Sequence, residues 1–212
     1  MINTIIVEDN LYVQKHLSNM LEKDPRFNIA GIYRDAFEAE SRCRQERVDL
    51  VLMDVQTLHN HSGLAAGKRI KEACPRTKVV IVTSLVDPDV LTKARHGAAD
   101  SLWYKDHGDE DIMEVIEQTL AGGHRFPDAS PDVELKKVLS SKLTPRQIEI
   151  LRRYVTGMTY DEIAADLNIT NVGVRWNLDK MVETCGYKNK HELLAAAIES
   201  KLIVTSLEEQ KQ

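Results

Sequence analysis

The sequence predicts a doubly wound α/β domain followed by a smaller, purely helical domain. Two rhythms in the sequence lead to this division. Up to about Gly122, short runs of β-forming residues alternate with segments of helical apolar spacing, which is typical of a parallel sheet covered by helices on both faces. Beyond Lys142 the apolar spacing is helical throughout. We therefore expect two domains of different architecture.

The first half contains five predicted strands. Their residues are 4–7, Phe27–Tyr33, Leu50–Met53, Lys78–Thr83 and Ser101–Tyr104. The third run, LVLM, is apolar without alternation, as expected of a strand buried on both faces. Helices are predicted between the strands and after the last one, from apolar residues three and four positions apart. The clearest sets are Val13, Leu17, Met20 and Leu21, and Ile112, Val115, Ile116 and Leu120.

The second half begins with a predicted linker over residues 123–141. Its glycines, prolines and mixed charges indicate a connection, with a short helix predicted over 133–139. Four short helices are expected after it. The signals for their ends are two capping boxes, Thr144 with Gln147 and Thr159 with Glu162, and two glycines, Gly157 and Gly186.

Composition sets broad limits on function. The chain has 212 residues and a net charge of −5, but the acidic excess lies in the first half, so charge neither demands nor excludes nucleic-acid binding by the second. No apolar run approaches the roughly 20 residues of a membrane span, and the N-terminus lacks a signal-peptide pattern, so we expect a cytoplasmic protein without a membrane partner. Cys43, Cys74 and Cys185 lack metal-site spacing and are expected to be reduced packing residues.

Polar side chains lie at or just after the carboxyl ends of four of the predicted strands. Glu8 and Asp9 come after the first strand, Asp54 after the third, Thr83 ends the fourth and Lys105 follows the fifth. Because the carboxyl ends of parallel strands share one edge of the sheet, these five side chains should meet. Considered alone, Asp54 could equally cap the next helix or turn, but five coinciding positions favour a site.

The chemistry of these five groups suits phosphoryl transfer. Clustered carboxylates repel one another unless a cation neutralises them, and an oxygen-rich site suits Mg²⁺. A carboxylate beside Mg²⁺, with a hydroxyl and an ammonium ready to meet new negative charge, is arranged to receive a phosphoryl group. Asp54, the central carboxylate, is the expected nucleophile.

Four motifs occur in order along this half: the acidic pair in IIVEDN, the aspartate in LVLMD, the threonine in VVIVTS and the lysine in LWYKD. With them, residues 1–122 resemble the receiver domain of response regulators. The resemblance implies a flavodoxin-like fold in which Asp54 accepts a phosphoryl group from a histidine kinase. It also implies that Glu8, Asp9 and Asp54 hold Mg²⁺, and that Thr83 and Lys105 contact the phosphoryl oxygens.

Two features depart from the receiver pattern: the loop after Asp54 and the residue at position 102. Thr57-Leu58 replaces the usual Met-Pro after the phosphorylated aspartate, and Gly63 comes one residue late, so we expect a longer, differently shaped loop. Leu102 stands where receivers commonly have tyrosine or phenylalanine. Strand alternation points the neighbouring Trp103 to the opposite face.

Two other chemistries are considered for the loop after Asp54. His59 and His61 raise the question of a metal site, but no third ligand is near in sequence, and we expect exposed histidines instead. A phosphatase of the haloacid dehalogenase type has a second aspartate two residues after the first, and Gln56 occupies that position. We therefore do not expect an enzyme.

In the second half, the segments LTPRQIEIL, GMTYDEIAADLNIT and VRWNLDKM, with an apolar helix over 191–198, resemble the DNA-binding domain of the LuxR and NarL type. Independently, two short helices over 161–167 and 171–183 joined by a tight turn predict a helix-turn-helix. Val174, Leu178 and Met181 should form the inward face of the second helix. Its candidate DNA contacts are Asn171, Arg175, Trp176, Asn177 and Lys180.

This helix also departs from its family. Gly173, Arg175 and Asn177 stand where threonine, lysine and histidine are usual. Gly173 lowers helix propensity by about 1 kcal/mol relative to alanine. Asp179 repels phosphate and can pair with Arg175 one turn earlier.

The expected function is that of a DNA-binding transcriptional response regulator in a two-component phosphorelay. Its expected parts are a receiver over 1–122, a linker over 123–141, a LuxR-type domain over 142–205 and a tail over 206–212. The expected partners are a histidine kinase, double-stranded DNA and a second copy of the chain, with RNA polymerase as a further candidate. Residues open to either dimer contacts or core packing are Leu193, Leu194, Ala197 and Ile198. The alternative is a regulator that acts without phosphorylation.

Overall fold

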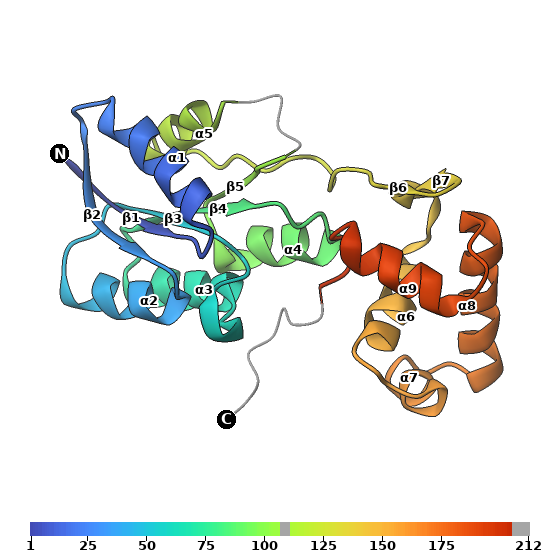
Figure 1. Cartoon of the computed structure of the whole chain (residues 1–212). Coiled ribbons are helices and arrows are strands. Elements are labelled where there is room, and N and C mark those ends of the chain that lie inside the picture. Colours follow the sequence, from blue (N-terminus) through green and yellow to red (C-terminus); the bar gives the residue numbers. More distant parts are fainter. Residues whose placement is uncertain (107–110, 205–212) are drawn as a thin grey trace. The chain divides into compact units, whose positions relative to one another are not determined.

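The structure, a computed structural model, describes residues 1–106 and 111–204 (Figure 1). It divides into two compact units. Of the described residues, the first contains Met1–Ser84 and Pro88–Ala129, and the second contains Leu85–Asp87 and residues 130–204. The predicted tail over 206–212 lies outside the described residues.

The first unit is built on a five-stranded sheet of order β2-β1-β3-β4-β5, in which every pairing is parallel. The strands are β1 Ile2–Val7, β2 Phe27–Tyr33, β3 Leu50–Met53, β4 Lys78–Thr83 and β5 Ser101–Tyr104. All five stand where the sequence predicts them, although β1 begins two residues earlier. This order, with helices between the strands, confirms the doubly wound α/β prediction.

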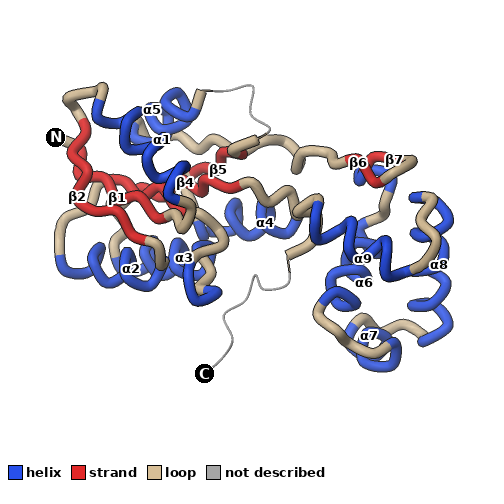
Figure 2. Tube along the Cα trace, viewed as in Figure 1, coloured by secondary structure: helices blue, strands red, loops and turns tan. Residues whose placement is uncertain are grey.

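Helices cover both faces of this sheet (Figures 1 and 2). They are α1 Leu11–Glu22, α2 Ala36–Gln45, α3 Gly63–Ala73, α4 Pro88–Lys93 and α5 Ile112–Leu120. Helices α1 and α5 lie on one face, where Leu17, Leu21 and Ile116 pack on the sheet, while α2, α3 and α4 lie on the other. No helix within the described ranges combines the length and apolar character that a membrane crossing requires.

The strand register brings the carboxyl ends together. Val7 at the end of β1 lies beside Met53 at the end of β3, and Met53 lies beside Ile81 of β4. Thr83 at the end of β4 lies beside Tyr104 at the end of β5. The residues that follow these strands therefore emerge at one edge of the sheet.

The second unit is mainly helical, as predicted. Its helices are α6 Pro145–Val155, α7 Tyr160–Asp166, α8 Asn171–Cys185 and α9 Lys190–Glu199. Both predicted capping boxes form, at the starts of α6 and α7, and α8 ends at Gly186 with φ 75°. Its core includes Leu135, Leu151, Ile163, Val174, Leu178, Met181, Leu193 and Ala197.

The helix predicted over 133–139 is wrong, because this segment forms a hairpin of β6 Glu134–Leu135 and β7 Val138–Leu139. Leu135 is fully buried in the core of the second unit, and Lys136 in the turn has φ 54°. After the hairpin, Ser140 Oγ and Ser141 N both donate hydrogen bonds to the carboxylate of Asp132. These tertiary contacts override the local helical spacing.

We predict that Gly63→Ala lowers the free energy of unfolding. A Cβ atom at Gly63 would lie 1.8 Å from the carbonyl oxygen of Asp54, which is backbone and has to shift. The expected loss is about 1–3 kcal/mol, the range for overpacking a filled site. Chemical denaturation of the full chain measures it.

The matched control is Gly173→Ala on α8, where the nearest heavy atom to an added Cβ is Thr170 Oγ1 at 3.3 Å. This variant should keep or slightly raise stability, since alanine favours a helix. Equal stability of Gly63→Ala and the wild type would show that this contact of the loop with Asp54 is loose.

Candidate functional site

The predicted carboxylates meet at the sheet edge. Glu8 and Asp9 follow β1 and Asp54 follows β3, and ligand oxygens of the three lie within 4.8 Å of one another. Glu8 is 2% exposed and Asp54 9%, whereas Asp9 is exposed. One member of the cluster therefore faces solvent while the other two are enclosed.

Lys105 joins the two buried carboxylates. Its Nζ lies 2.5 Å from Glu8 Oε2 and 3.0 Å from Asp54 Oδ2. Burial alone would lower the pKa of Lys105, but the charges of Asp54 and Glu8 outweigh burial and raise this pKa above its usual value. The amine is therefore charged and held against the carboxylates, as predicted.

Asp54 is the most perturbed of the acids. Burial raises the pKa of Asp54 to about 6, the ammonium of Lys105 opposes this rise, and the carboxylate of Glu8 adds to it. The backbone nitrogen of Val55 donates to Asp54 Oδ1 at 2.7 Å, which fixes the carboxylate plane. A single ammonium thus compensates the buried negative charge only in part.

The donor set fits Mg²⁺. Three carboxylates offer hard oxygen ligands, and the exposure of Asp9 leaves room for the water molecules that Mg²⁺ retains. A divalent cation among them would oppose the burial and the repulsion from Glu8 that raise the pKa of Asp54. Glu8, Asp9 and Asp54 are the residues able to hold it.

Thr83 stands at the same edge. It is the last residue of β4 and fully buried, and its carbonyl oxygen accepts a hydrogen bond from the backbone nitrogen of Lys105 at 2.9 Å. The backbone of Thr83 therefore adjoins that of Lys105. Leu102 is buried, and Trp103 packs with the α1 and α5 cluster, so their side chains lie on opposite faces of the sheet as expected.

The loop after Asp54 has its own shape. An isolated antiparallel bridge joins Gln56 to Ser62, and a single tight turn over Leu58–Asn60 fills the space between them. The backbone nitrogen of Gly63 donates to the carbonyl of Val55, which returns the chain beside Asp54.

His59 and His61 are partly exposed but have a partner that the sequence reasoning missed. The Nδ1 atoms of both rings lie within hydrogen-bond distance of the buried carboxylate of Asp35. Asp35 comes two residues after Tyr33, the end of β2. The rule that strand ends share one edge also applies to β2, so it could have placed Asp35 beside this loop.

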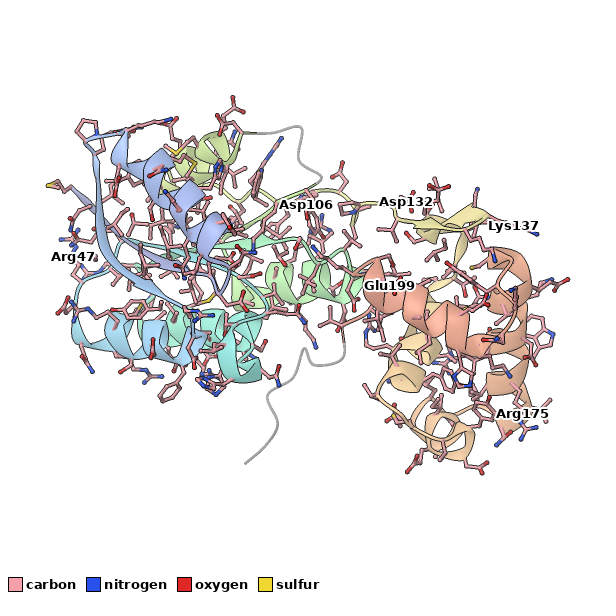
Figure 3. All side chains as sticks on the ribbon, in the orientation of Figure 1. Arg47, Asp106, Asp132, Lys137, Arg175 and Glu199 are labelled. Atoms are coloured by element: carbon pink, nitrogen blue, oxygen red, sulfur yellow. The ribbon has the colours of Figure 1, made fainter. Side chains whose placement is uncertain are left out.

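Helix α8 of the second unit carries the predicted surface. Val174, Leu178 and Met181 are fully buried, as expected. Arg175 is exposed, as Figure 3 shows, and Trp176 is 62% exposed, while Lys180 is exposed as well. The outward face is therefore the predicted one.

The two asparagines of this helix are less available than expected. Asn171 Nδ2 donates to Asp161 Oδ1 at 2.6 Å, and Asn177 Nδ2 donates to the carbonyl of Gly173 at 2.8 Å. Both side chains are half-buried. The amide of Asn171 thus joins α8 to α7, and the amide of Asn177 bonds within α8.

The charges around α8 are paired differently from the expectation. Asp179 forms an ion pair with Lys190 of α9 at 2.8 Å, so the expected pair between Asp179 and Arg175 is wrong. The guanidinium of Arg175 lies instead over the ring of Tyr160, 5.2 Å from its centroid. Asp179 and Arg175 thus contact residues of other helices, and the spacing of residues along α8 does not reveal these contacts.

Of the four residues proposed for dimer contacts on α9, two belong to the core. Leu193 and Ala197 are fully buried within the second unit, which makes packing their role. Leu194 is half-buried and Ile198 is 45% exposed. Only these last two remain available to a partner.

Comparisons with known proteins agree with this geometry. The model of the response regulator receiver domain matches residues 4–117, and that of the bacterial regulatory proteins of the luxR family matches residues 141–197. The response regulator protein VraR of Staphylococcus aureus is 25% identical over 210 residues, which cover 95% of this chain and 99% of that protein. VraR of Staphylococcus saprophyticus is 24% identical over 208 residues, with the same coverage.

A solved structure shows the same fold. RcsB from Salmonella enterica serovar Typhimurium, bound to promoter P1flhDC in the presence of phosphomimetic BeF3⁻, has a TM-score of 0.62 and 20% identity. The alignment covers 94% of this chain and 98% of RcsB. The receiver match alone spans more than half of the sequence. This chain therefore belongs to the response regulators, with a receiver domain followed by a regulatory domain of the luxR family.

Proposed function

We propose that a histidine kinase activates this transcriptional regulator by phosphoryl transfer to Asp54, and that its second unit binds DNA. The observation that carries the proposal is the enclosed Asp54 carboxylate with Lys105 Nζ at 3.0 Å and acidic neighbours suited to Mg²⁺. The receiver is assigned to residues 1–122 and the DNA-binding domain to 142–205. The hairpin belongs to the second unit and residues 123–129 belong to the first, so the predicted linker over 123–141 is divided between the two units.

The chemistry follows from the groups present. A carboxylate oxygen of Asp54 attacks the phosphorus of a phosphohistidine, and the P–N bond breaks with its electron pair left on the imidazole. Mg²⁺ held by Glu8, Asp9 and Asp54 would neutralise charge on the phosphoryl oxygens. The ammonium of Lys105 and the hydroxyl of Thr83 then face the new negative charge.

DNA binding is assigned to the exposed face of α8. Arg175 can make a bidentate contact with a guanine edge, and Lys180 supplies attraction to phosphate. Trp176, at 62% exposure, offers an apolar surface beside them. The match to the luxR family and the DNA-bound state of RcsB support this assignment.

A second copy of the chain is the proposed partner on DNA. Two-fold symmetry of a dimer would match paired half-sites. Leu194 and Ile198 on α9 are the apolar residues proposed for such a contact, since their neighbours Leu193 and Ala197 are buried in the core.

The alternative is a regulator that works without phosphorylation. Leu102 favours it, because this buried side chain replaces the aromatic residue that receivers commonly use for readout. The first experiment below decides between the two.

Incubation with acetyl phosphate and Mg²⁺ should add one phosphoryl group to the wild-type chain, as measured by intact mass. Asp54→Asn should remain unmodified, because it lacks the nucleophilic carboxylate. Asp128→Asn, at an exposed position, is the matched control and should be modified like the wild type. A wild-type chain that stays unmodified, with its cognate kinase as well, would establish the alternative.

Asp9→Asn should weaken Mg²⁺ binding by at least about tenfold, the range seen when even the groups supporting a metal ligand are removed. Asp9 is exposed, so the thermal stability of the metal-free chain should not change. Calorimetric titration measures the affinity. Glu22→Gln, another exposed acid, is the control, and equal Mg²⁺ affinity in all three proteins would remove Asp9 from the site.

Arg175→Ala should weaken binding to DNA selected by the wild-type protein by about 1–3 kcal/mol and relax its sequence preference. Lys180→Ala should weaken binding to all sequences alike and lower its salt dependence. Fluorescence anisotropy at several salt concentrations measures both. Lys142→Ala removes an equal charge from an exposed position outside α8 and should bind like the wild type. The reverse pattern would move the interface away from α8.

A further inference from the structure

A second cluster of metal-ligating side chains lies at the same edge of the sheet but apart from the acidic one. It consists of Asp35, which follows β2, and of His59 and His61 in the loop that follows Asp54. His59 Nδ1 lies 2.9 Å from Asp35 Oδ2, and His61 Nδ1 lies 2.6 Å from Asp35 Oδ1. One ligand atom from each of the three falls within 4.8 Å of those of the other two.

The backbone holds these side chains together. Leu58 N donates to the carbonyl of Arg34 at 2.8 Å, which fastens the loop to the connection between β2 and α2. The hydroxyl of Thr57 accepts from Ala36 N and donates to the carbonyl of His61 at 2.7 Å. The ligand-bearing segments are thus anchored on both sides of the cluster.

The cluster is also open on one side. Asp35 is buried, whereas the side chains of His59 and His61 are 68% and 37% exposed. His59 has φ 60°, a conformation that costs free energy in a residue other than glycine. That conformation keeps an exposed imidazole directed at the buried carboxylate.

The chemistry of the donors distinguishes this cluster from the acidic one. Two imidazole nitrogens and one carboxylate oxygen suit Zn²⁺ and similar transition metals, whereas three carboxylates suit Mg²⁺. With metal–ligand distances of about 2.1 Å, neighbouring ligands of a tetrahedral ion are about 3.4 Å apart. The present separations, 2.9 Å to Asp35 Oδ2 and 2.6 Å to Asp35 Oδ1, would have to lengthen by about 0.5–0.8 Å, and each neutral imidazole can carry its proton on Nε2.

We propose that Asp35, His59 and His61 form a site for a divalent transition metal, with Zn²⁺ as the best-fitting ion and an open fourth position on the solvent side. The site is distinct from the acidic cluster, and it fastens the loop between Gln56 and Gly63 to the start of α2. It does not depend on phosphorylation of Asp54. The competing role is a metal-free hydrogen-bond network.

The test is Zn²⁺ titration of the metal-stripped full chain against a chromogenic chelator, in excess Mg²⁺. The wild type should bind one equivalent. His59→Ala should bind at least about tenfold more weakly, and the double variant His59→Ala with His61→Ala should show no specific binding. His96→Ala, at an exposed histidine of the same unit, and Asp54→Asn should both bind like the wild type.

Two further measurements use the wild type alone and so do not depend on whether a histidine variant folds. Co²⁺ added to the wild type should give the visible absorption of a four-coordinate nitrogen and oxygen site, without a thiolate charge-transfer band from the cysteines. Zn²⁺ should also raise the unfolding temperature of the wild type. A wild type that binds no stoichiometric Zn²⁺, a double variant that binds it equally, or a thiolate band would each overturn the proposal and leave the hydrogen-bond network.

Discussion

The ammonium of Lys105 between Glu8 and Asp54 is the interaction on which the site depends. Two carboxylates enclosed side by side repel each other and lose hydration, and such charges persist in a protein only when they are paired. Each of the three groups is the first residue after its strand, following β1, β3 and β5. Parallel pairing in register therefore delivers all three to one place. A slip of one residue in any of these strands would turn its side chains to the other face and leave a buried charge unpaired.

The loop from Gln56 to Gly63 is tied to this charge cluster through the backbone. Its first bridge begins two residues after Asp54, and Gly63 returns so close to the Asp54 carbonyl that no side chain fits between them. A single tight turn over Leu58–Asn60 lies between the bridge and this glycine. The same turn orients two imidazoles toward Asp35. The conformation of this loop therefore affects both the backbone beside Asp54 and the positions of the two imidazoles beside Asp35.

Much of the fold could be predicted from the sequence, because strand runs, capping boxes and terminal glycines are local signals that tertiary contacts reinforce here. The convergence of Glu8, Asp9, Asp54 and Lys105 could be predicted as well, because a parallel sheet brings residues after successive strands to one edge. The hairpin at β6 and β7 could not, because Leu135 takes its conformation from a core formed by residues far along the chain. The position of Asp35 near this loop follows from the end of β2, but the hydrogen bonds of His59 and His61 to it depend on how the loop folds back, which spacing does not encode.

Several polar side chains of α8 already have partners within the second unit. The charge of Asp179 repels phosphate, but its ion pair with Lys190 offsets that charge. The amides of Asn171 and Asn177 are engaged within the helix-turn-helix, so base reading by them would require breaking bonds that position the helix. Arg175 lies over the ring of Tyr160, a contact that confines a long side chain while leaving its donors free to rotate outward. Since a confined side chain loses less entropy on binding, the contact with Tyr160 would favour the proposed role of Arg175 in reading a base.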